Sequence, residues 1–151
     1  MYVAVYLILV QDNKVLLLQR ANTGFEDGNY SVPAGHVENN EPVSSALLRE
    51  VKEEIGVEIK KDDIHFLNVN HRKSDRDKPY LDFFFTASCW QGEITNCEPH
   101  KCDHLAWYDL GQLPKNMTKF VKRVILNLNK TDKTYSEYGF DTISTDYKTP
   151  S

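Results

Sequence analysis

Cysteine is scarce in this sequence of 151 residues, which contains only Cys89, Cys97 and Cys102. An odd, sparse set of this kind does not form the disulfide framework of a small secreted domain, so we expect a reduced, cytoplasmic protein. Long hydrophobic runs are also missing. The apolar run at the N-terminus ends by Val10 and has no basic stretch before it, which disfavours a signal peptide. No other stretch reaches the length of a membrane span.

An excess of basic residues is missing as well. Lys and Arg number 18 against 22 Asp and Glu, which gives a formal net charge of −4. A nonspecific nucleic-acid binder needs a basic surface, so nucleic acid is not an expected partner. The sequence has no internal repeat. Its length suits one hydrophobic core, and we expect a single domain over residues 1–140 with residues 141–151 as a flexible tail.

The stretch from Gly35 to Val57 carries the strongest pattern. Pro42 suits a first helical position and Gly56 suits the residue just past a helix end, so the sequence predicts a helix between them. At about 100° per residue, the apolar side chains fall on one arc. This expected core face consists of Leu47, Leu48, Val51 and Ile55.

The opposite arc of this helix is centred on Ala46 and is charged. Glu50, Glu53 and Glu54 are spaced i, i+3 and i+4, so their carboxylates are neighbours that repel one another. Arg49 alone is placed to compensate, by pairing with Glu53 at i+4. Clustered oxygen ligands around a small residue are what a hard divalent cation binds, so the pattern predicts a metal site. An ordinary helix with a solvated acidic face is the alternative.

The same stretch resembles the signature of the Nudix hydrolases, Gly-x5-Glu-x7-Arg-Glu-U-x-Glu-Glu-x-Gly-U, where U is a bulky aliphatic residue. Its fixed positions are filled by Gly35, Glu41, Arg49, Glu50, Val51, Glu53, Glu54, Gly56 and Val57. The resemblance extends from Tyr2 to about Leu128. It implies the Nudix fold and the hydrolysis of a nucleoside diphosphate linked to another group.

The resemblance also implies roles for the residues of the motif. Mg²⁺ or Mn²⁺ would be held by one main-chain carbonyl and three carboxylates, those of Gly35, Glu50, Glu53 and Glu54. Arg49 would orient the glutamates through a salt bridge, and Glu41 would help either through contacts behind the metal ligands or by binding an outer metal ion. The general base stays open between Glu53, Glu50 and Glu98. Glu98 is a candidate from its place in the loop before the Trp-bearing strand, and an ordinary surface glutamate is an equal alternative.

Four residues outside the motif are candidates for substrate contacts. Arg20 ends an expected strand, where many Nudix proteins carry an Arg near the substrate, although a solvated Arg is the alternative. Lys101 could meet a phosphate. Phe83 could stack on a base, with core packing as the alternative. The Asn116 amide could read a purine edge, as an Asn near this point does in the MutT-like branch, but an N-cap is the favoured interpretation.

The rest of the chain predicts an α/β fold. Strands are expected over residues 2–10, 15–20, 64–70, 80–88 and 105–108, and a second helix over 117–129. The first two strands have continuous apolar character, which indicates burial on both faces. We therefore expect an α/β/α sandwich with a mixed β-sheet. Residues 135–140 carry enough apolar surface to pack back on the domain.

Two polar loops allow alternative interpretations. The charged loop from His71 to Pro79 is either a solvated hairpin tip, which is favoured, or a guide for an anionic substrate. The loop over residues 96–104 carries Cys and His residues that suggest zinc, but their spacing matches no standard finger or ribbon. These residues are Cys97, His100, Cys102 and His104.

The substrate is indicated only by elimination. ADP-ribose enzymes of the family tend to carry a Pro about sixteen residues after the motif, and dinucleoside polyphosphate enzymes a Tyr. The positions around Lys73 hold neither. We therefore expect a MutT-like nucleoside triphosphate pyrophosphohydrolase, with an oxidised guanine nucleotide such as 8-oxo-dGTP as one candidate substrate. Other nucleoside diphosphate derivatives, including NADH, and a non-catalytic nucleotide sensor are the alternatives, and either a monomer or a homodimer is expected.

Overall fold

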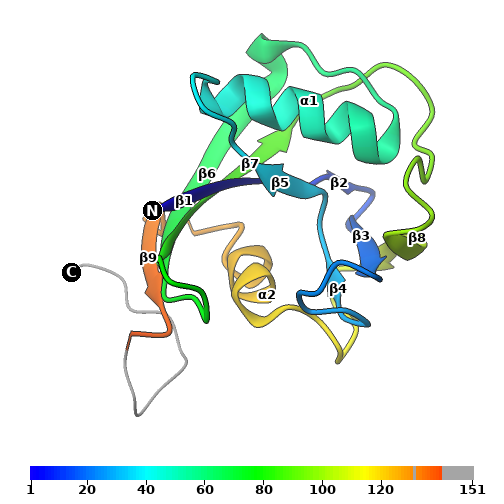
Figure 1. Cartoon of the computed structure of the whole chain (residues 1–151). Helices are drawn as coiled ribbons and strands as arrows, with labels where there is room; N and C mark the ends of the chain where they lie inside the picture. The colour runs from blue at the N-terminus through cyan, green and yellow to red at the C-terminus, as the bar shows by residue number, and fades with distance from the viewer. Residues whose placement is uncertain (131, 141–151) are drawn as a thin grey trace.

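The computed structural model describes residues 1–130 and 132–140 (Figure 1). It has two α-helices in this part of the chain, α1 (Val43–Ile55) and α2 (Lys119–Leu126), and a 3-10 turn over Lys61–Asp63. The strands are β1 (Tyr2–Leu7), β2 (Val10–Gln11), β3 (Lys14–Arg20), β4 (Tyr30–Ser31), β5 (Ala34–His36), β6 (Ile64–Arg72), β7 (Tyr80–Ala87), β8 (Cys102–Asp109) and β9 (Tyr135–Tyr138).

The strands form two sheets. A five-stranded sheet has the order β5-β1-β7-β6-β9, in which β1 is parallel to β7 and β6 is parallel to β9 while the other pairs are antiparallel. A four-stranded antiparallel sheet joins β2, β4 and β8 to β3. Figure 1 shows α1 and α2 on opposite sides of the larger sheet. The expected α/β sandwich with a mixed sheet is thereby confirmed, with a second sheet that the sequence pattern did not separate.

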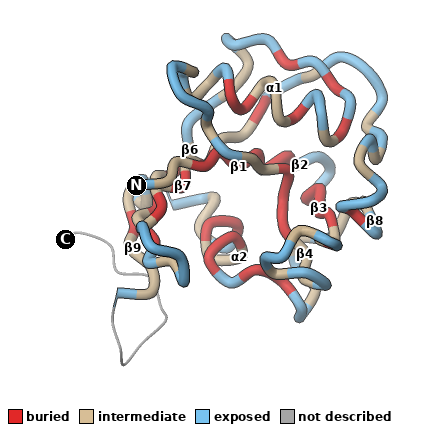
Figure 2. Tube along the Cα trace, viewed as in Figure 1, coloured by how far each residue is buried: buried red, intermediate tan, exposed pale blue. Residues whose placement is uncertain are grey.

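Strand β1 is buried on both faces, as predicted. Val5 and Leu7 belong to the hydrophobic cluster under α1, whereas Tyr6 and Ile8 belong to the cluster around α2. Side chains alternate between the two faces of a strand, so one strand supplies both cores. Figure 2 shows the resulting buried residues along β1 and on the inner sides of both helices. This sheet is the partition between the two layers and fixes the position of α1.

Several predicted boundaries were wrong near the N-terminus and α1. The first strand ends at Leu7, and Val10 starts a separate short strand that pairs with Val15 of β3. Pro42 is the N-cap of α1, and the helix begins at Val43. Gly56 ends the helix with φ of 76°, a left-handed conformation that glycine adopts without strain, as predicted. Ala46 is fully buried, so the acidic arc is not centred on an exposed residue.

Other boundaries shift in the second half. The second helix is shorter than predicted and begins at Lys119, whereas β8 starts at Cys102 and takes three residues from the expected polar loop. Strand β6 extends to Arg72, which is buried, so the favoured solvated loop from His71 to Pro79 was wrong for Arg72. The predicted packing of residues 135–140 is confirmed for β9, which pairs with β6. The predicted tail over 141–151 lies outside the described residues.

No helix in the described ranges is long and apolar enough to cross a membrane.

Candidate active site

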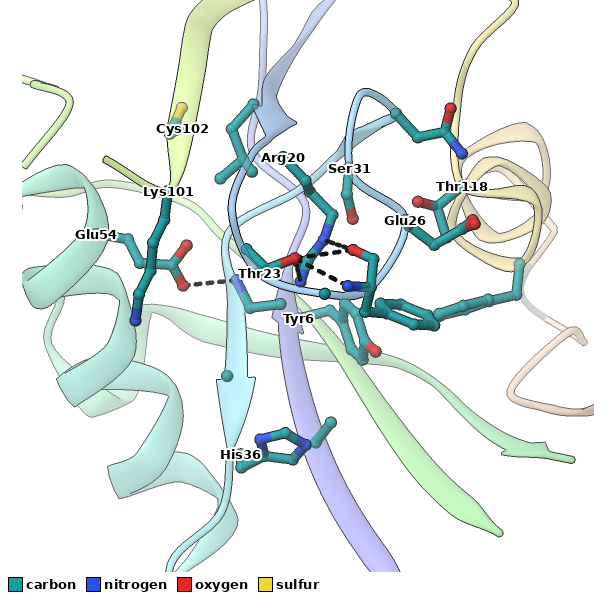
Figure 3. A pocket seen from close by; sticks show the side chains of 18 of the residues that line it. Tyr6, Arg20, Thr23, Glu26, Ser31, His36, Glu54, Lys101, Cys102 and Thr118 are labelled. Carbon is teal, nitrogen blue, oxygen red and sulfur yellow. Dashed lines mark hydrogen bonds between the residues drawn. The ribbon is translucent and has the colours of Figure 1, made fainter. Parts of the chain in front are cut away.

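A cleft of about 1400 Å³ runs between α1 and the start of α2. One wall consists of the acidic residues of α1 together with β5, and the opposite wall contains Thr118 and Phe120. Figure 3 shows Glu54 towards α1, Thr118 towards α2 and Arg20 between them. The cleft therefore brings Gly35 and the three glutamates of α1 into one cavity with three of the four residues expected to contact substrate, Arg20, Lys101 and Asn116.

Helix α1 is held against β5 through its carboxylates. Glu54 accepts a hydrogen bond through Oε1 from the Ala34 main-chain N–H at 3.0 Å, which Figure 3 shows as a dashed line. The next residue, Gly35, faces Glu50 so closely that a Cβ at Gly35 would overlap the Glu50 carboxylate. The absence of a side chain at Gly35 is therefore a requirement of this packing, because it lets a helix carboxylate lie directly on the strand backbone.

Arg49 organises the acidic face in a way that the helical wheel only partly predicted. Its strongest partner is Glu41 in the loop before the helix, which accepts hydrogen bonds from Nε at 2.8 Å and from Nη2 at 3.0 Å. Nη1 donates to Glu50 Oε1 at 2.9 Å and lies 3.5 Å from Glu53 Oε2. The predicted pairing with Glu53 is thus present but longer. A bidentate guanidinium–carboxylate pair fixes geometry as well as charge. Glu41 therefore holds Arg49 in place, and Arg49 in turn orients the Glu50 carboxylate.

The acidic side chains have different electrostatic environments. Burial raises the pKa of Glu54 well above its usual range, and the charges of Glu50 and Glu98 raise it further. Burial also raises the pKa of Glu50, although its bond to Arg49 opposes the shift. The hydrogen bonds from Arg49 lower the pKa of Glu41 to about 2. Glu53 has 52% of its side chain exposed, so it is the acidic residue of α1 most open to a ligand in the cleft.

The residues in this wall fit a hard divalent cation. The cleft is lined by Gly35 and by carboxylates of α1, and two of these carboxylates, Glu50 and Glu54, are disfavoured as bare anions by burial and by mutual repulsion. A cation would relieve that repulsion and would favour the ionised forms. In the part of the chain that is described, no three acidic, His or Cys side chains already converge as a ligand set. Glu50 accepts a hydrogen bond from Arg49, and Glu54 accepts one from Ala34. A cation that binds these two carboxylates would replace those hydrogen bonds.

The loop that precedes β8 carries two of the predicted residues. Glu98 and Lys101 both line the cleft. The Glu98 carbonyl accepts hydrogen bonds from the main-chain N–H groups of Lys101 and Cys102, at 2.9 and 3.0 Å, which makes a tight turn. The Lys101 carbonyl in turn accepts from Ala21 N–H at 2.9 Å, so the turn is tied to the end of β3. The structure thereby places Lys101 beside the strand that ends in Arg20.

Arg20 lies in the cleft, but it is engaged with its own loop. Its Nε donates to the Phe25 carbonyl at 2.8 Å and its Nη2 donates to Thr23 Oγ1 at 3.1 Å. The guanidinium also lies over the Phe25 ring, 5.4 Å from the centroid. These contacts position Arg20 as a cation at the middle of the cleft and do not require a charged partner within the protein.

The two candidate base-contact residues lie in different places. Asn116 lines the cleft, and its Nδ2 donates to the Gly28 carbonyl at 2.9 Å. The favoured N-cap interpretation of Asn116 was wrong, because the N-cap of α2 is Thr118. Phe83 is partly buried against the hydrophobic cluster under α1 and lies outside the lining of the cleft. Its position matches the core-packing alternative.

Sequence reasoning missed a buried ion pair in the cleft. Arg72 donates from Nε to Asp82 Oδ2 at 2.7 Å and from Nη2 to Asp82 Oδ1 at 3.1 Å, and both residues are buried. Tyr6 donates to Asp82 Oδ1 at 3.2 Å, and Asn70 donates to Oδ2 at 3.3 Å. One signal was available in the sequence. Side chains alternate along a strand, so Asp82 lies on the same face as Phe84, which indicates that the carboxylate is buried.

The zinc alternative in the loop before β8 is not supported. Cys102 is buried and donates its Sγ hydrogen to the His104 carbonyl, whereas Cys97 is exposed. The ring of His104 instead lies 3.0 Å, at Nδ1, from the Tyr30 hydroxyl. Among the described residues no group of three His, Cys, Asp or Glu side chains could hold a metal ion as arranged, and this includes these four.

Comparison with known proteins gives consistent matches. Residues 1–128 match the sequence profile of the NUDIX domain. An ADP-ribose pyrophosphatase of Methanocaldococcus jannaschii is 36% identical over 115 residues, which cover 75% of this chain and 64% of that protein. The 8-oxo-dGTP diphosphatase of Proteus vulgaris is 33% identical over 95 residues, which cover 63% of this chain and 82% of that protein. The match to the archaeal protein thus covers less than two thirds of its length.

A solved structure supports the same match at the level of the fold. The crystal structure of a MutT NUDIX hydrolase from Burkholderia pseudomallei superposes with a TM-score of 0.76 at 26% identity, covering 83% of this chain and 95% of that one.

Proposed function

Because this chain belongs to the Nudix family, we propose that it is a metal-dependent pyrophosphohydrolase that cleaves a nucleoside triphosphate to a monophosphate and pyrophosphate. The observation that carries the proposal is the composition of a single cleft. The acidic residues of α1 and Gly35 belong to one wall, Thr118 and Phe120 belong to the opposite wall, and Arg20 lies between the two (Figure 3). A triphosphate has the same order of groups, with metal-bound phosphates at one end and a base at the other.

The residues of the first wall would hold Mg²⁺ or Mn²⁺ through the Gly35 carbonyl and the carboxylates of Glu50, Glu53 and Glu54. Such an ion would supply charge to neutralise the phosphate oxygens and would make a water more acidic for attack at phosphorus. Hydrolysis of this kind needs little covalent chemistry from the protein, because positioning and charge compensation supply most of the barrier reduction.

The chain's own cations complete the phosphate site. Arg20 is fixed by Phe25 and Thr23 within the cleft, and the exposed side chain of Lys101 lies on the turn tied to Ala21. Both can donate to the phosphate oxygens. Arg49 has a different task. Its bonds to Glu41 and Glu50 hold the Glu50 carboxylate at Gly35, so Arg49 is a positioning residue.

A carboxylate of this wall would accept the proton of the attacking water. Glu53 is the first choice because its side chain is more exposed than that of Glu50, at 52% against 18%, and because its contact with Arg49 is longer, at 3.5 Å against 2.9 Å. Glu50 is committed to Arg49 at 2.9 Å. Glu98 approaches from the opposite loop and is the other candidate.

A second candidate substrate is ADP-ribose. The archaeal relative with 36% identity is named an ADP-ribose pyrophosphatase, whereas the relative from Proteus is named an 8-oxo-dGTP diphosphatase. The same metal wall serves either substrate, since both contain a diphosphate. The triphosphate stays our first choice because the sequence lacks the Pro that marks ADP-ribose enzymes downstream of the motif.

A substrate panel tests the proposal. The purified chain is incubated with dNTPs, 8-oxo-dGTP, ADP-ribose, dinucleoside polyphosphates and NADH, with Mg²⁺, with Mn²⁺ and with a chelator. We expect metal-dependent release of pyrophosphate and a nucleoside monophosphate from at least one triphosphate. Faster turnover of ADP-ribose would favour the second candidate, and no turnover of any compound would favour a nucleotide sensor.

A further inference from the structure

We propose that Arg72, held by Asp82 and joined by the hydroxyl of Thr118, recognises the base of the nucleotide and selects a 6-oxopurine over adenine. This inference rests on the proposed function, since it names the base carried by the same substrate. It concerns the wall of the cleft that lies away from the metal ligands.

The Arg72 guanidinium is confined on three sides. Its central carbon lies 4.3 Å from the centroid of the Tyr80 ring and 4.2 Å from the centroid of the Phe120 ring. One edge of the group, formed by Nε and Nη2, is bonded to Asp82. A guanidinium is planar, so the remaining amino group, Nη1, points away from that edge. Since Arg72 lines the cleft, Nη1 is the donor it can offer to a ligand.

Asp82 makes this donor rigid. The carboxylate is fully buried and is bonded to Tyr6 and Asn70 as well as to Arg72. The ion pair is therefore fixed from several strands, and its charge is compensated within the protein. A compensated, immobile guanidinium serves for directional hydrogen bonding more than for general attraction of anions. Asp82 acts through Arg72 and is a positioning residue.

Thr118 supplies an independent observation. Its side-chain Oγ1 is buried and has no hydrogen-bond partner, although the residue is the N-cap of α2. Only 1% of the residue is exposed, and it lines the cleft (Figure 3). A buried hydroxyl without a partner destabilises the folded state, because it has lost its bonds to water without replacing them. A ligand group in the cleft that bonds to this hydroxyl would remove that destabilisation.

The chemistry of the two groups indicates which base fits. Arginine is a donor without acceptor capacity, and its usual base partners are the O6 and N7 acceptors of guanine. Adenine presents an N6 amino group where guanine and hypoxanthine present O6, so adenine would place a donor against a donor. The hydroxyl of Thr118 can donate or accept and so adapts to either neighbour. The wall therefore favours guanine and hypoxanthine.

Equilibrium binding of monophosphates tests this selection without relying on catalysis. Calorimetry with GMP, IMP and AMP measures the dissociation constants for the wild-type chain. We expect GMP and IMP to bind about tenfold or more tightly than AMP, because one hydrogen bond to a charged group is at stake. IMP lacks the 2-amino group, so equal binding of GMP and IMP assigns the selection to the 6-oxo edge that they share and excludes the 2-amino group. Equal binding of GMP and AMP overturns the proposal.

Two variants assign the selection to the named residues. Arg72→Lys keeps a cation beside Asp82 but removes the planar fork, and we expect the GMP-to-AMP ratio to fall about tenfold. Thr118→Val removes a hydroxyl that has no partner in the protein, so we expect weaker GMP binding with no loss of thermal stability. Thr86→Val, on β7 outside the cleft, is the matched control and should bind GMP as the wild type does.

The outcomes separate this inference from the proposed function. An unchanged GMP-to-AMP ratio in Arg72→Lys would overturn the assignment of Arg72, and unchanged GMP affinity in Thr118→Val would overturn that of Thr118, even if triphosphates are hydrolysed. If Arg72→Lys does not fold, the wild-type comparison of GMP, IMP and AMP still decides the selection, and Thr118→Val still decides the role of the hydroxyl. Selective GMP binding by a chain that hydrolyses no triphosphate would refute the proposed function and leave the base assignment in place.

Discussion

Gly35 and Glu50 lie so close together that a Cβ at position 35 would occupy the place of the Glu50 carboxylate. The two residues come from neighbouring layers, β5 and α1. Their approach explains why the Nudix-like motif requires glycine at this position in this chain. It also sets the carboxylate beside the Gly35 main chain, where we propose that the metal ion binds.

Gly35→Ala should therefore abolish most of the activity. The residue has no positive φ, so alanine strains the backbone little, but the Glu50 side chain must leave its place, because the three nearest atoms all belong to it. Displacing that carboxylate should lower kcat by about 10²-fold, the usual effect of a misplacement of about 1 Å. Gly111→Ala, in a distant turn, is the control for a glycine replacement without positive φ. Wild-type kcat in Gly35→Ala would contradict the assigned position of Glu50.

The stability of the metal-free protein should fall as pH rises above the ordinary carboxyl range. Burial raises the pKa of Glu54 above its unfolded value of 4.5, so between 4.5 and the raised pKa the folded state holds more protons than the unfolded chain. The free energy of unfolding must then decrease with pH through that window. Glu41 works in the opposite sense, since its pKa of about 2 gives stability that is lost as pH falls below 4.5.

Thermal unfolding at roughly pH 5 to pH 8, in chelator and in excess Mg²⁺, measures this effect. This range lies above the ordinary pKa values of carboxyl groups. We expect the melting temperature in chelator to fall with pH, and the stabilisation by Mg²⁺ to grow, because ligands must lose protons to bind the ion. Glu54→Gln should remove most of the slope. The surface replacement Glu58→Gln should retain it, since Glu58 pairs only with exposed Lys52. A slope that survives in Glu54→Gln would assign it to other groups.

Breaking the buried ion pair should destabilise the fold. Asp82→Asn leaves the Arg72 charge buried without its counter-charge, and we expect the free energy of unfolding to fall by about 3 kcal/mol. Replacing both residues, Arg72→Met with Asp82→Asn, should recover most of this loss because no buried charge remains. Urea denaturation of the wild type, Arg72→Met, Asp82→Asn and the double variant gives the coupling free energy of the pair. If the losses in the free energy of unfolding of the two single variants simply add up in the double variant, Arg72 and Asp82 are not energetically coupled.

The sequence was sufficient to predict α1 and the face that it buries, because that information is local. The period of the apolar residues gave the core face over Leu47, Val51 and Ile55, and Gly56 ended the helix as expected. The same period placed Glu50, Glu53 and Glu54 together. The two-sided burial of β1 was equally readable, since continuous apolar sequence is typical of a strand between two layers.

The far wall of the cleft could not be predicted because it depends on strand register. Arg72 stands in a charged stretch and looked solvated, but β6 continues through it and pairs Arg72 with Tyr80. Asn70 then faces Asp82 in the same register, and the ion pair follows from it. The start of α2 was also non-local, because the bridge between Tyr30 and Met117 holds this segment extended and delays the helix to Lys119.

The most direct test of the central claim is the turnover number of Glu53→Gln with saturating Mg²⁺ and the best triphosphate substrate. If the α1 carboxylates bind the ion and accept the proton of water, kcat should fall by about 10²-fold or more. The control Glu58→Gln replaces an exposed glutamate paired with Lys52 and should keep the wild-type value. Turnover of Glu53→Gln close to that of the wild type would contradict the account.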